Sequence, residues 1–372
     1  MKLIASLKGY QPISFVQDRI LLAKGYDLYL ADLECKYCQY IGSVPQTLGV
    51  KIASWSRTLE RCLRLGIRYG CEISKSRILL AERRRIWKLD LHANSIELDH
   101  EIEQGARPLA INYVQGIKGF DDGAYFGEYW DNLGKGPVNI WARKEDDRWS
   151  VVHTFTEGTI NHIHALIPDK NRGVVWILTG DFDRAPGIWA ARDNFSSVTP
   201  VLAGEQEYRC CWLAFWGNRV VYATDSPLSL NSVREMIFAD EVSHPAQSPV
   251  GLRSEPLLDT AGSSIYSCMV QDRLVFSTAV EPGMPSGVLI RDMFERKPGP
   301  GIRDHCAYLI AGTAERGFSV IGSWAKDRLP PRLCEFGTIK FPVGVNPGPF
   351  LYAYFVGLSG MDGSMSVFEM DE

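Results

Sequence analysis

Two pairs of similar segments recur along the chain at spacings of about fifty residues. Residues 18–33 (DRILLAKGYDLYLADL) match residues 76–91 (SRILLAERRRIWKLDL), and the Ile-Trp pair at 140–141 recurs at 188–189. Periods of this length are typical of repeat folds, in which each unit buries its apolar surface against its neighbours. The repeat therefore constrains the fold more strongly than any single motif.

The segments between these repeats consist of short apolar runs separated by turn residues. GVVWILTG and FWGNRVVY are examples, and in FWGNRVVY a Gly-Asn pair stands between two strand-like runs, as expected for a hairpin. The 10 Trp, 15 Tyr and 16 Phe also favour strands over helices. A unit of about 50 residues with four short strands is typical of a β-propeller blade. We therefore predict an all-β fold, a β-propeller of four-stranded blades, with seven blades favoured over six.

We expect one propeller domain over residues 1–372. The N-terminal segment KLIASL is expected to pair with the last blade, and residues 54–66 are expected to form a short helical insertion with helically spaced leucines. The blades are expected near residues 10–45, 63–103, 106–155, 160–204, 207–258, 263–313 and 317–370.

Composition excludes some classes of partner. The formal charge of -4 gives no overall basic field to hold a nucleic-acid backbone. No segment reaches the roughly 20 apolar residues of a membrane-spanning helix, and the N-terminus lacks the apolar core of a signal peptide. We expect a soluble cytoplasmic protein whose oligomeric state the sequence leaves open.

Cysteine usage gives little sign of a structural metal site. The nine cysteines include the adjacent Cys210 and Cys211 and one C-x-x-C pair, Cys35 and Cys38, without a second pair at zinc-ribbon spacing. We expect reduced, mostly buried thiols.

Two segments resemble a known family. VNIWARKEDDRW at 138–149 and GIWAARDNFSSV at 187–198 are similar to the Asp-box repeats of sialidase-like, BNR-repeat propellers. The order of YFGEYWDN, NHIH, WILTGDFD and YATDS also resembles uncharacterised bacterial propellers of the glycosidase-like type. The resemblance implies a propeller scaffold and a carbohydrate ligand.

Polar residues follow apolar strands in three consecutive predicted blades. Glu128, Asp181 and Asp225 each come after such a strand, and His162 and His164, two residues apart, share one face of a strand. We expect these groups to converge where the inner strands end. Tyr129 lies beside Glu128, as in glycosidases that use a Tyr nucleophile with a Glu partner.

The predicted site has a catalytic set and a substrate-binding set. The catalytic candidates are Glu128, Tyr129, His162, His164 and Asp181. The substrate-binding candidates are Asp183, Arg209, Asp225, Arg303 and His305.

Two classes of function remain open. A glycoside hydrolase-like enzyme would use a pair of carboxylates, and a polysaccharide lyase would use His or Tyr as base. The alternative is a non-catalytic propeller that binds a glycan or a protein. Two histidines without a third ligand at definable spacing are a weak metal signal, so we predict no cofactor and no metal ligand, although a divalent cation stays possible.

Overall fold

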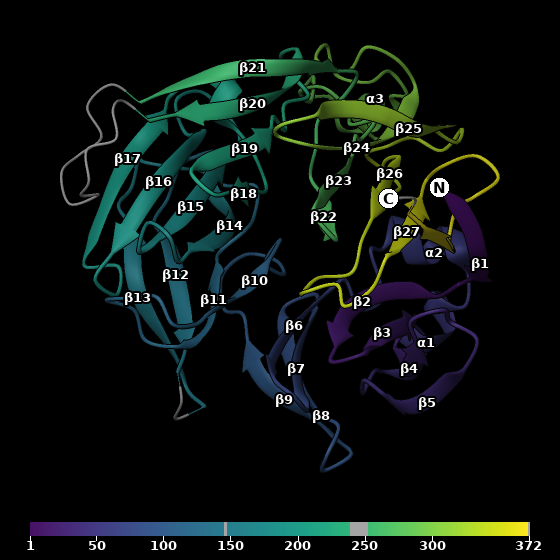
Figure 1. Ribbon diagram of the computed structural model, residues 1–372. Helices are drawn as coiled ribbons and strands as arrows, with labels where there is room; N and C mark the ends of the chain where they lie inside the picture. Colours follow the sequence, from purple (N-terminus) through teal and green to yellow (C-terminus); the bar gives the residue numbers. More distant parts are fainter. Residues whose placement is uncertain (145–146, 239–251, 371–372) are drawn as a thin grey trace. The chain divides into compact units, whose positions relative to one another are not determined.

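The computed structural model describes residues 1–144, 147–238 and 252–370. These residues form seven antiparallel sheets of four strands each, arranged as a β-propeller (Figure 1). The predicted all-β class and the favoured number of seven blades are confirmed. The chain falls into two compact units, unit 1 (residues 1–101 and 261–372) and unit 2 (residues 102–260).

Unit 1 contains four blades. Blade 1 consists of β2 (Gln11–Val16), β3 (Arg19–Lys24), β4 (Asp27–Asp32) and β5 (Cys38–Ser43). Blade 2 consists of β6 (Tyr69–Ser74), β7 (Arg77–Glu82), β8 (Arg85–Asp90) and β9 (Ser95–Glu101). Blade 6 consists of β22 (Ser267–Val270), β23 (Arg273–Ser277), β24 (Cys306–Thr313) and β25 (Gly317–Ala325). Blade 7 consists of β26 (Thr338–Lys340), β27 (Phe350–Val356), β28 (Ser364–Glu369) and β1 (Lys2–Lys8).

Blade 7 is built from both ends of the chain. Strand β1 pairs antiparallel with β28, with Ser6 opposite Ser366, as expected for the N-terminal segment. The expected start of this blade at residue 317 is wrong, because β25 pairs with β24 through a tight turn at Gly317. A short hairpin turn places a strand beside the strand that precedes it in the chain. Residues 317–325 therefore complete blade 6.

Unit 2 contains three blades in chain order. Blade 3 consists of β10 (Ile111–Val114), β11 (Gly123–Gly127), β12 (Val138–Arg143) and β13 (Trp149–Phe155). Blade 4 consists of β14 (His162–Asp169), β15 (Val174–Gly180), β16 (Gly187–Arg192) and β17 (Ser197–Ala203). Blade 5 consists of β18 (Ala214–Trp216), β19 (Arg219–Ala223), β20 (Asn231–Ile237) and β21 (Arg253–Thr260), preceded by the 3-10 turn η1 (Gln206–Tyr208).

Apolar side chains fill the space between blades 3 and 4. Tyr125 and Ile140 of blade 3 share one buried cluster with Ile163 and Ile177 of blade 4. The repeated Ile-Trp pair occupies matching positions, because Trp141 lies opposite Phe126 and Trp189 lies opposite Ile177. The 48-residue repeat thus marks equivalent strands of adjacent blades.

The predicted helix at 54–66 corresponds to the shorter α2 (Arg57–Cys62), and a second helix that was not predicted, α1 (Leu48–Ser54), precedes it. Ser56 separates them, since it has extended backbone angles and its hydroxyl oxygen accepts a hydrogen bond from Leu59 N as the N-cap of α2. A further short helix, α3 (Leu289–Phe294), precedes β24. No helix within the described residues has the length and apolar character that crossing a lipid bilayer requires.

Cys62 and Cys334 form a disulfide, which corrects the expectation that the thiols are all reduced. The other seven cysteines are free, and Cys210 and Cys211 are buried as expected.

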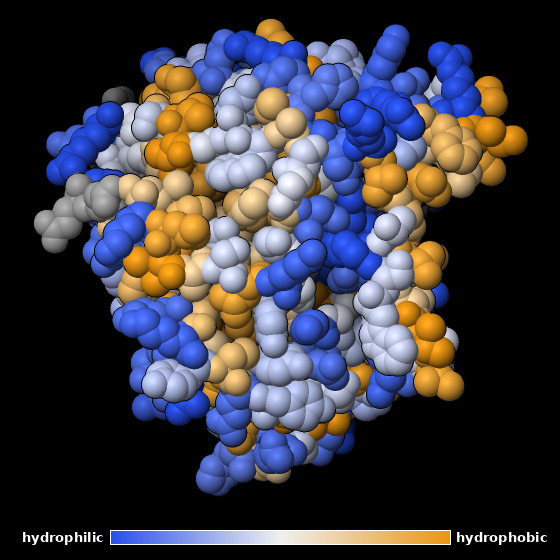
Figure 2. Space-filling model, turned by 90° about the vertical axis from the view of Figure 1, so that its right-hand side faces the viewer, coloured by the Kyte–Doolittle hydropathy of each residue, from blue (hydrophilic) through white to orange (hydrophobic). Residues whose placement is uncertain are grey.

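On the face shown in Figure 2, hydrophobic side chains form separate patches among hydrophilic ones.

Gly127 tests how tightly blades 3 and 4 approach each other. A β-carbon at this position would collide with the side chain of Ile163, whereas one at Gly134 would meet open space. We expect Gly127→Ala to lower the free energy of unfolding by about 1–3 kcal/mol, the usual cost of overpacking. Gly134→Ala should change it by less than about 0.5 kcal/mol. Urea unfolding of both variants makes the comparison, and equal effects would contradict the tight approach.

Candidate functional site

The polar residues of unit 2 gather around the start of β14. His162 and His164 lie on one face of this strand, as predicted, with ring centroids 5.1 Å apart. The strand β15 ends opposite them, with His162 paired to Gly180. A β-carbon on Gly180 would lie 2.5 Å from Nε2 of His164, so glycine at this position leaves room for the imidazole ring.

Backbone carbonyl groups fix the orientation of both rings. Nδ1 of His162 lies 2.8 Å from the carbonyl oxygen of Trp130, and Nδ1 of His164 lies 2.9 Å from that of Cys210. A carbonyl oxygen only accepts hydrogen bonds, so both Nδ1 atoms carry the proton and donate it. In the neutral rings, the lone pair is therefore on Nε2.

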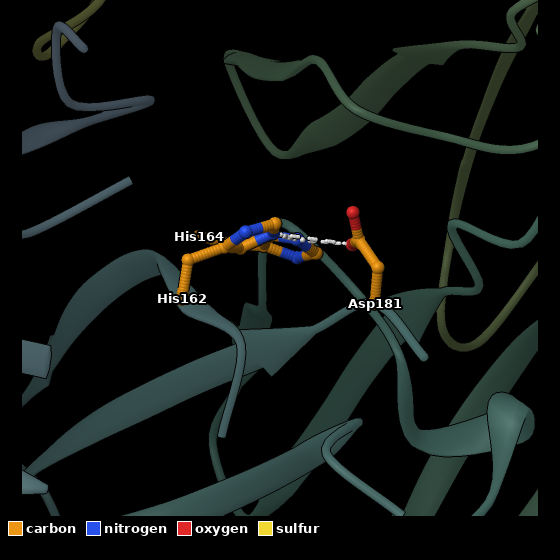
Figure 3. A group of neighbouring side chains, drawn as sticks. All are labelled: His162, His164 and Asp181. Carbon is orange, nitrogen blue, oxygen red and sulfur yellow. Dashed lines mark hydrogen bonds and ion pairs between the residues drawn. The ribbon is translucent and has the colours of Figure 1, made fainter. Parts of the chain in front are cut away.

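The two Nε2 atoms converge on one carboxylate oxygen (Figure 3). They lie 3.1 Å from each other, and Asp181 Oδ1 lies 3.0 Å from Nε2 of His164 and 3.2 Å from Nε2 of His162. Both imidazoles are almost fully buried, and the Asp181 side chain is 15% exposed. Two imidazole nitrogens and one carboxylate oxygen, each with an available lone pair, thus lie close together in unit 2.

Asn161 and Arg209 hold Asp181 in place. Asn161 Oδ1 accepts hydrogen bonds from the backbone N–H groups of Asp181 and Phe182, at 3.1 and 3.0 Å. Arg209 Nη2 lies 2.9 Å from Asp181 Oδ1. Burial alone would raise the pKa of Asp181, but the Arg209 guanidinium holds the pKa well below its usual range. Asp181 is therefore a carboxylate at neutral pH.

Arg209 also connects the cluster to Asp225, which lies 3.5 Å from its Nε. The Cys211 thiol donates to Asp225 Oδ2 at 3.2 Å and lies 3.4 Å from Nδ1 of His164. Burial, and then the negative charge of Asp225, raises the pKa of this thiol well above its usual value. Cys211 is therefore a protonated thiol and a poor nucleophile, despite its histidine neighbour.

Tyr129 packs its ring against His162, with centroids 4.4 Å apart. Burial, and then the charge of Asp181, raises the pKa of the Tyr129 phenol well above its usual value. The phenol stays protonated at neutral pH, so it is available to donate a hydrogen bond and is unsuited to act as a base.

Glu128 does not belong to this cluster, contrary to the expectation that it converges with Asp181. Its carboxylate accepts hydrogen bonds from Asn139 N at 2.8 Å, Asn139 Nδ2 at 3.1 Å and Trp141 Nε1 at 3.0 Å. The equivalent position in blade 4 is Thr179, whose hydroxyl accepts from Trp189 Nε1. Glu128 therefore connects strands within blade 3.

Three of the predicted substrate-binding residues are not among the side chains that form this cluster of unit 2. They are Asp183, Arg303 and His305. Asp183 has a side chain that is 76% exposed, and it pairs with Lys135 at 3.3 Å. Arg303 and His305 are exposed residues of unit 1, and His305 lines a cavity of about 170 Å³ there.

Two groups of the described side chains have the spacing of metal ligands. One is His162, His164 and Asp181, and the other is His164, Cys211 and Asp225. The second group would use Nδ1 of His164, which already donates its proton to Cys210 O. The first group uses only Nε2 lone pairs and a carboxylate, and its separations match the roughly 3.0–3.4 Å between ligands at about 2.1 Å from a metal ion. The residue types therefore fit a transition-metal ion at the first group.

Sequence reasoning found six members of the cluster and missed three. His162, His164, Asp181, Arg209 and Asp225 were predicted together, and Tyr129, a predicted catalytic residue, packs against His162. Asn161, Cys211 and Gln206, whose Nε2 donates to Asp181 O at 2.8 Å, were not assigned. Asn161 directly precedes His162 and Cys211 closely follows Arg209, so proximity along the chain was the available signal.

Known structures share the fold of this chain. A chain from "Crystal Structure of Mitotic Checkpoint Complex" matches all of it with a TM-score of 0.55 and 8% identity, over 96% of its own length. The WD40 β-propeller domain of Doa1 matches all of it with a TM-score of 0.53 and 10% identity, over 97% of its own length. The tricorn protease matches with a TM-score of 0.55 and 10% identity, and the chain spans 33% of that protein. At such identities the likeness concerns the fold alone.

A comparison with models of known protein families finds no match, and a comparison with curated protein sequences finds none either. The fold and the site together define a seven-bladed β-propeller with a buried His-His-Asp cluster in unit 2.

Replacing Glu128 tests whether its role is structural. Glu128→Ala leaves the Asn139 amide groups and the Trp141 indole without their acceptor, and we expect a loss of about 2–4 kcal/mol in the free energy of unfolding. Glu128→Gln keeps one carbonyl acceptor and should lose less. Urea unfolding followed by tryptophan fluorescence measures both. A stable Glu128→Gln variant that loses ligand binding or activity at the histidine cluster would contradict a structural role.

Proposed function

We propose that His162, His164 and Asp181 bind a divalent transition-metal ion, and that this centre serves an enzyme that cleaves a glycan. The observation that carries the metal site is the convergence of two Nε2 lone pairs and a carboxylate oxygen within 3.2 Å of one another. Two nitrogen ligands and one oxygen ligand suit Zn²⁺, Fe²⁺ or Mn²⁺ and leave coordination positions for water or substrate.

A proton is the alternative to a metal ion between these atoms. If one Nε2 carried a proton, it would donate to the other ring or to Asp181. Burial is the main reason that the pKa of His164 is lowered, and it outweighs the attraction of Asp181. His164 is then neutral with its lone pair directed at the cluster, as a metal ligand requires.

The charge balance also favours a cation. Among the groups described above, Asp181 and Asp225 are carboxylates, Arg209 is a guanidinium that pairs with both, and Cys211 and Tyr129 are held neutral. Burial of a net negative charge is costly unless it is compensated. A divalent cation held by His162, His164 and Asp181 would offset negative charge of these carboxylates.

A metal centre changes the chemistry predicted from the sequence. A mechanism with two carboxylates cannot use Glu128, because its carboxylate accepts hydrogen bonds from other residues of blade 3. His162, His164 and Asp181 would instead hold a metal ion whose chemistry, when bound, would be that of a Lewis acid. Asp181 would be its anionic ligand, and the Tyr129 phenol would be a hydrogen-bond donor beside it. The carbohydrate substrate is supported by the resemblance of residues 138–198 to Asp-box propellers.

Metal binding by the purified chain tests the centre. After chelator treatment, titration calorimetry with Zn²⁺, Mn²⁺ and Co²⁺ should give one ion per chain. His162→Ala and Asp181→Asn should weaken the affinity at least about tenfold to a hundredfold, because each removes a ligand. Bound Co²⁺ should show visible absorption bands of nitrogen and oxygen coordination.

His92→Ala is the matched control, since His92 is an exposed histidine of unit 1. Each variant is first compared with the wild type by circular dichroism. If the folded wild-type protein binds no stoichiometric ion, the metal site is contradicted, and the three side chains share a proton instead. Equal weakening by His92→Ala would place the bound ion elsewhere.

Turnover tests the enzymatic part separately. The metal-loaded chain is incubated with acidic and neutral oligosaccharides, and new reducing ends and unsaturated-product absorbance are measured. We expect product with at least one oligosaccharide, its loss on chelation or in His162→Ala, and its return when metal is restored. Stoichiometric metal without product from any oligosaccharide would favour a binding propeller over an enzyme.

A further inference from the structure

A second cavity lies in unit 1, beside the helical insertion between blades 1 and 2. Its volume is about 580 Å³, within the range of ligand pockets. Residues of β1, of the β3–β4 hairpin and of both insertion helices line it. We call this cavity the insertion pocket.

The helix α2 is firmly anchored to blade 7 and its flanking loops. Arg57 Nη2 pairs with Asp362 Oδ1 at 2.8 Å. Arg61, only 1% exposed, pairs with Asp327 and donates to Glu335 O at 2.6 Å. Together with the disulfide from Cys62, these contacts hold a helix of six residues, which is too short to be stable alone.

This anchored segment nevertheless directs apolar side chains outward. Trp55, between the two helices, is 81% exposed and lines the pocket. Tyr29 of β4 also lines it and is half-buried. Exposure of an indole to water is unfavourable in the free protein, and flat aromatic surfaces of this kind stack on sugar rings.

The charges around the insertion pocket favour an anion. Lys8, Lys24 and Lys51 line it, and no carboxylate of the described chain lies within ion-pair distance of any of them. Lys24 Nζ lies 5.4 Å from the centroid of the Tyr10 ring, as a cation–π partner. Arg57 pairs with Glu60 and Asp362, so the four basic side chains of the lining stand against three carboxylates, Asp27, Glu60 and Asp362, and the three lysines are its unpaired cations among the described residues.

We infer that the insertion pocket binds an oligosaccharide that carries carboxylate or sulfate groups. Trp55 and Tyr29 would contact sugar faces, and the lysines would pair with the anionic groups. Asp27 and the hydroxyl of Ser54 would accept hydrogen bonds from sugar hydroxyls. The inference does not depend on the metal centre, whose residues lie in unit 2.

Calorimetry of the full chain tests the pocket with four probes. These are a galacturonate tetramer, a sulfated chondroitin tetrasaccharide, maltotetraose as a neutral sugar, and ATP. We expect at least one acidic oligosaccharide to bind more than tenfold more tightly than maltotetraose and ATP. Galacturonate carries carboxylates alone, whereas the sulfated chondroitin probe carries both carboxylates and sulfates, so binding of chondroitin without binding of galacturonate would show that sulfate is required.

Substitutions then locate the binding. Trp55→Ala and Lys51→Glu should each weaken the acidic oligosaccharide about tenfold or more, without loss of fold, because both side chains are exposed. Tyr37→Ala, at a 79% exposed tyrosine outside the pocket, and Lys118→Glu, at an exposed lysine of unit 2, are the matched controls.

The outcomes are distinct for each proposal. Binding that persists in His162→Ala but falls in Trp55→Ala supports the insertion pocket whatever the state of the metal centre. No binding of either acidic oligosaccharide at millimolar concentration overturns the inference. Equal binding of maltotetraose or ATP, or equal losses in the control variants, overturns it as well.

Discussion

A four-stranded blade has two faces, and in this protein both faces of most blades are apolar. The space between neighbouring blades within a unit is therefore the main core, as the shared cluster of Ile140 and Ile163 shows for blades 3 and 4. Gly127 permits the closest part of this contact. Because the core lies between sheets, the ends of the inner strands lack apolar partners and are where polar residues collect.

At these strand ends the backbone determines the chemistry of the side chains. The carbonyl oxygens of Trp130 and Cys210 each hold one imidazole by its Nδ1 proton. Without these two acceptors, either ring could present a proton to Asp181, and the cluster would be an ordinary hydrogen-bonded network. With them, two lone pairs meet a carboxylate, an arrangement that a cation stabilises.

Much of the fold and part of the site followed from the sequence. The Ile-Trp repeat and the alternation of apolar runs with turns were sufficient for the blade number, because a blade is a local unit. The pairing of β25 with blade 6 was not predicted, because the position of a strand in the sequence does not show which neighbouring strand it pairs with. The disulfide joins Cys62 to a cysteine 272 positions away, a separation that no local pattern can predict.

The misplacement of Glu128 has a specific physical reason. Glu128 and Asp181 both follow an apolar strand, so they appeared to be equivalent. The indole hydrogen bonds set the true register, in which Glu128 corresponds to Thr179 and Asp181 lies two residues further on. The loop before β12 is longer than the loop before β16. Counting back the same number of residues from Trp141 and from Trp189 therefore does not reach equivalent positions of the two blades.

The proposed metal site and the proposed ligand site in the insertion pocket differ in their exposure to solvent. At the centre, burial removes water from the imidazoles and Asp181, so electrostatic attraction for a cation is weakly screened. The pocket lysines are exposed, and mobile ions screen their attraction for a ligand over about 8 Å at physiological ionic strength. Rising salt should therefore weaken an acidic oligosaccharide at the insertion pocket much more than a metal ion at the His-His-Asp cluster. The aromatic contribution of Trp55 does not depend on charge, so the affinity that survives at high salt measures the stacking part of the interaction.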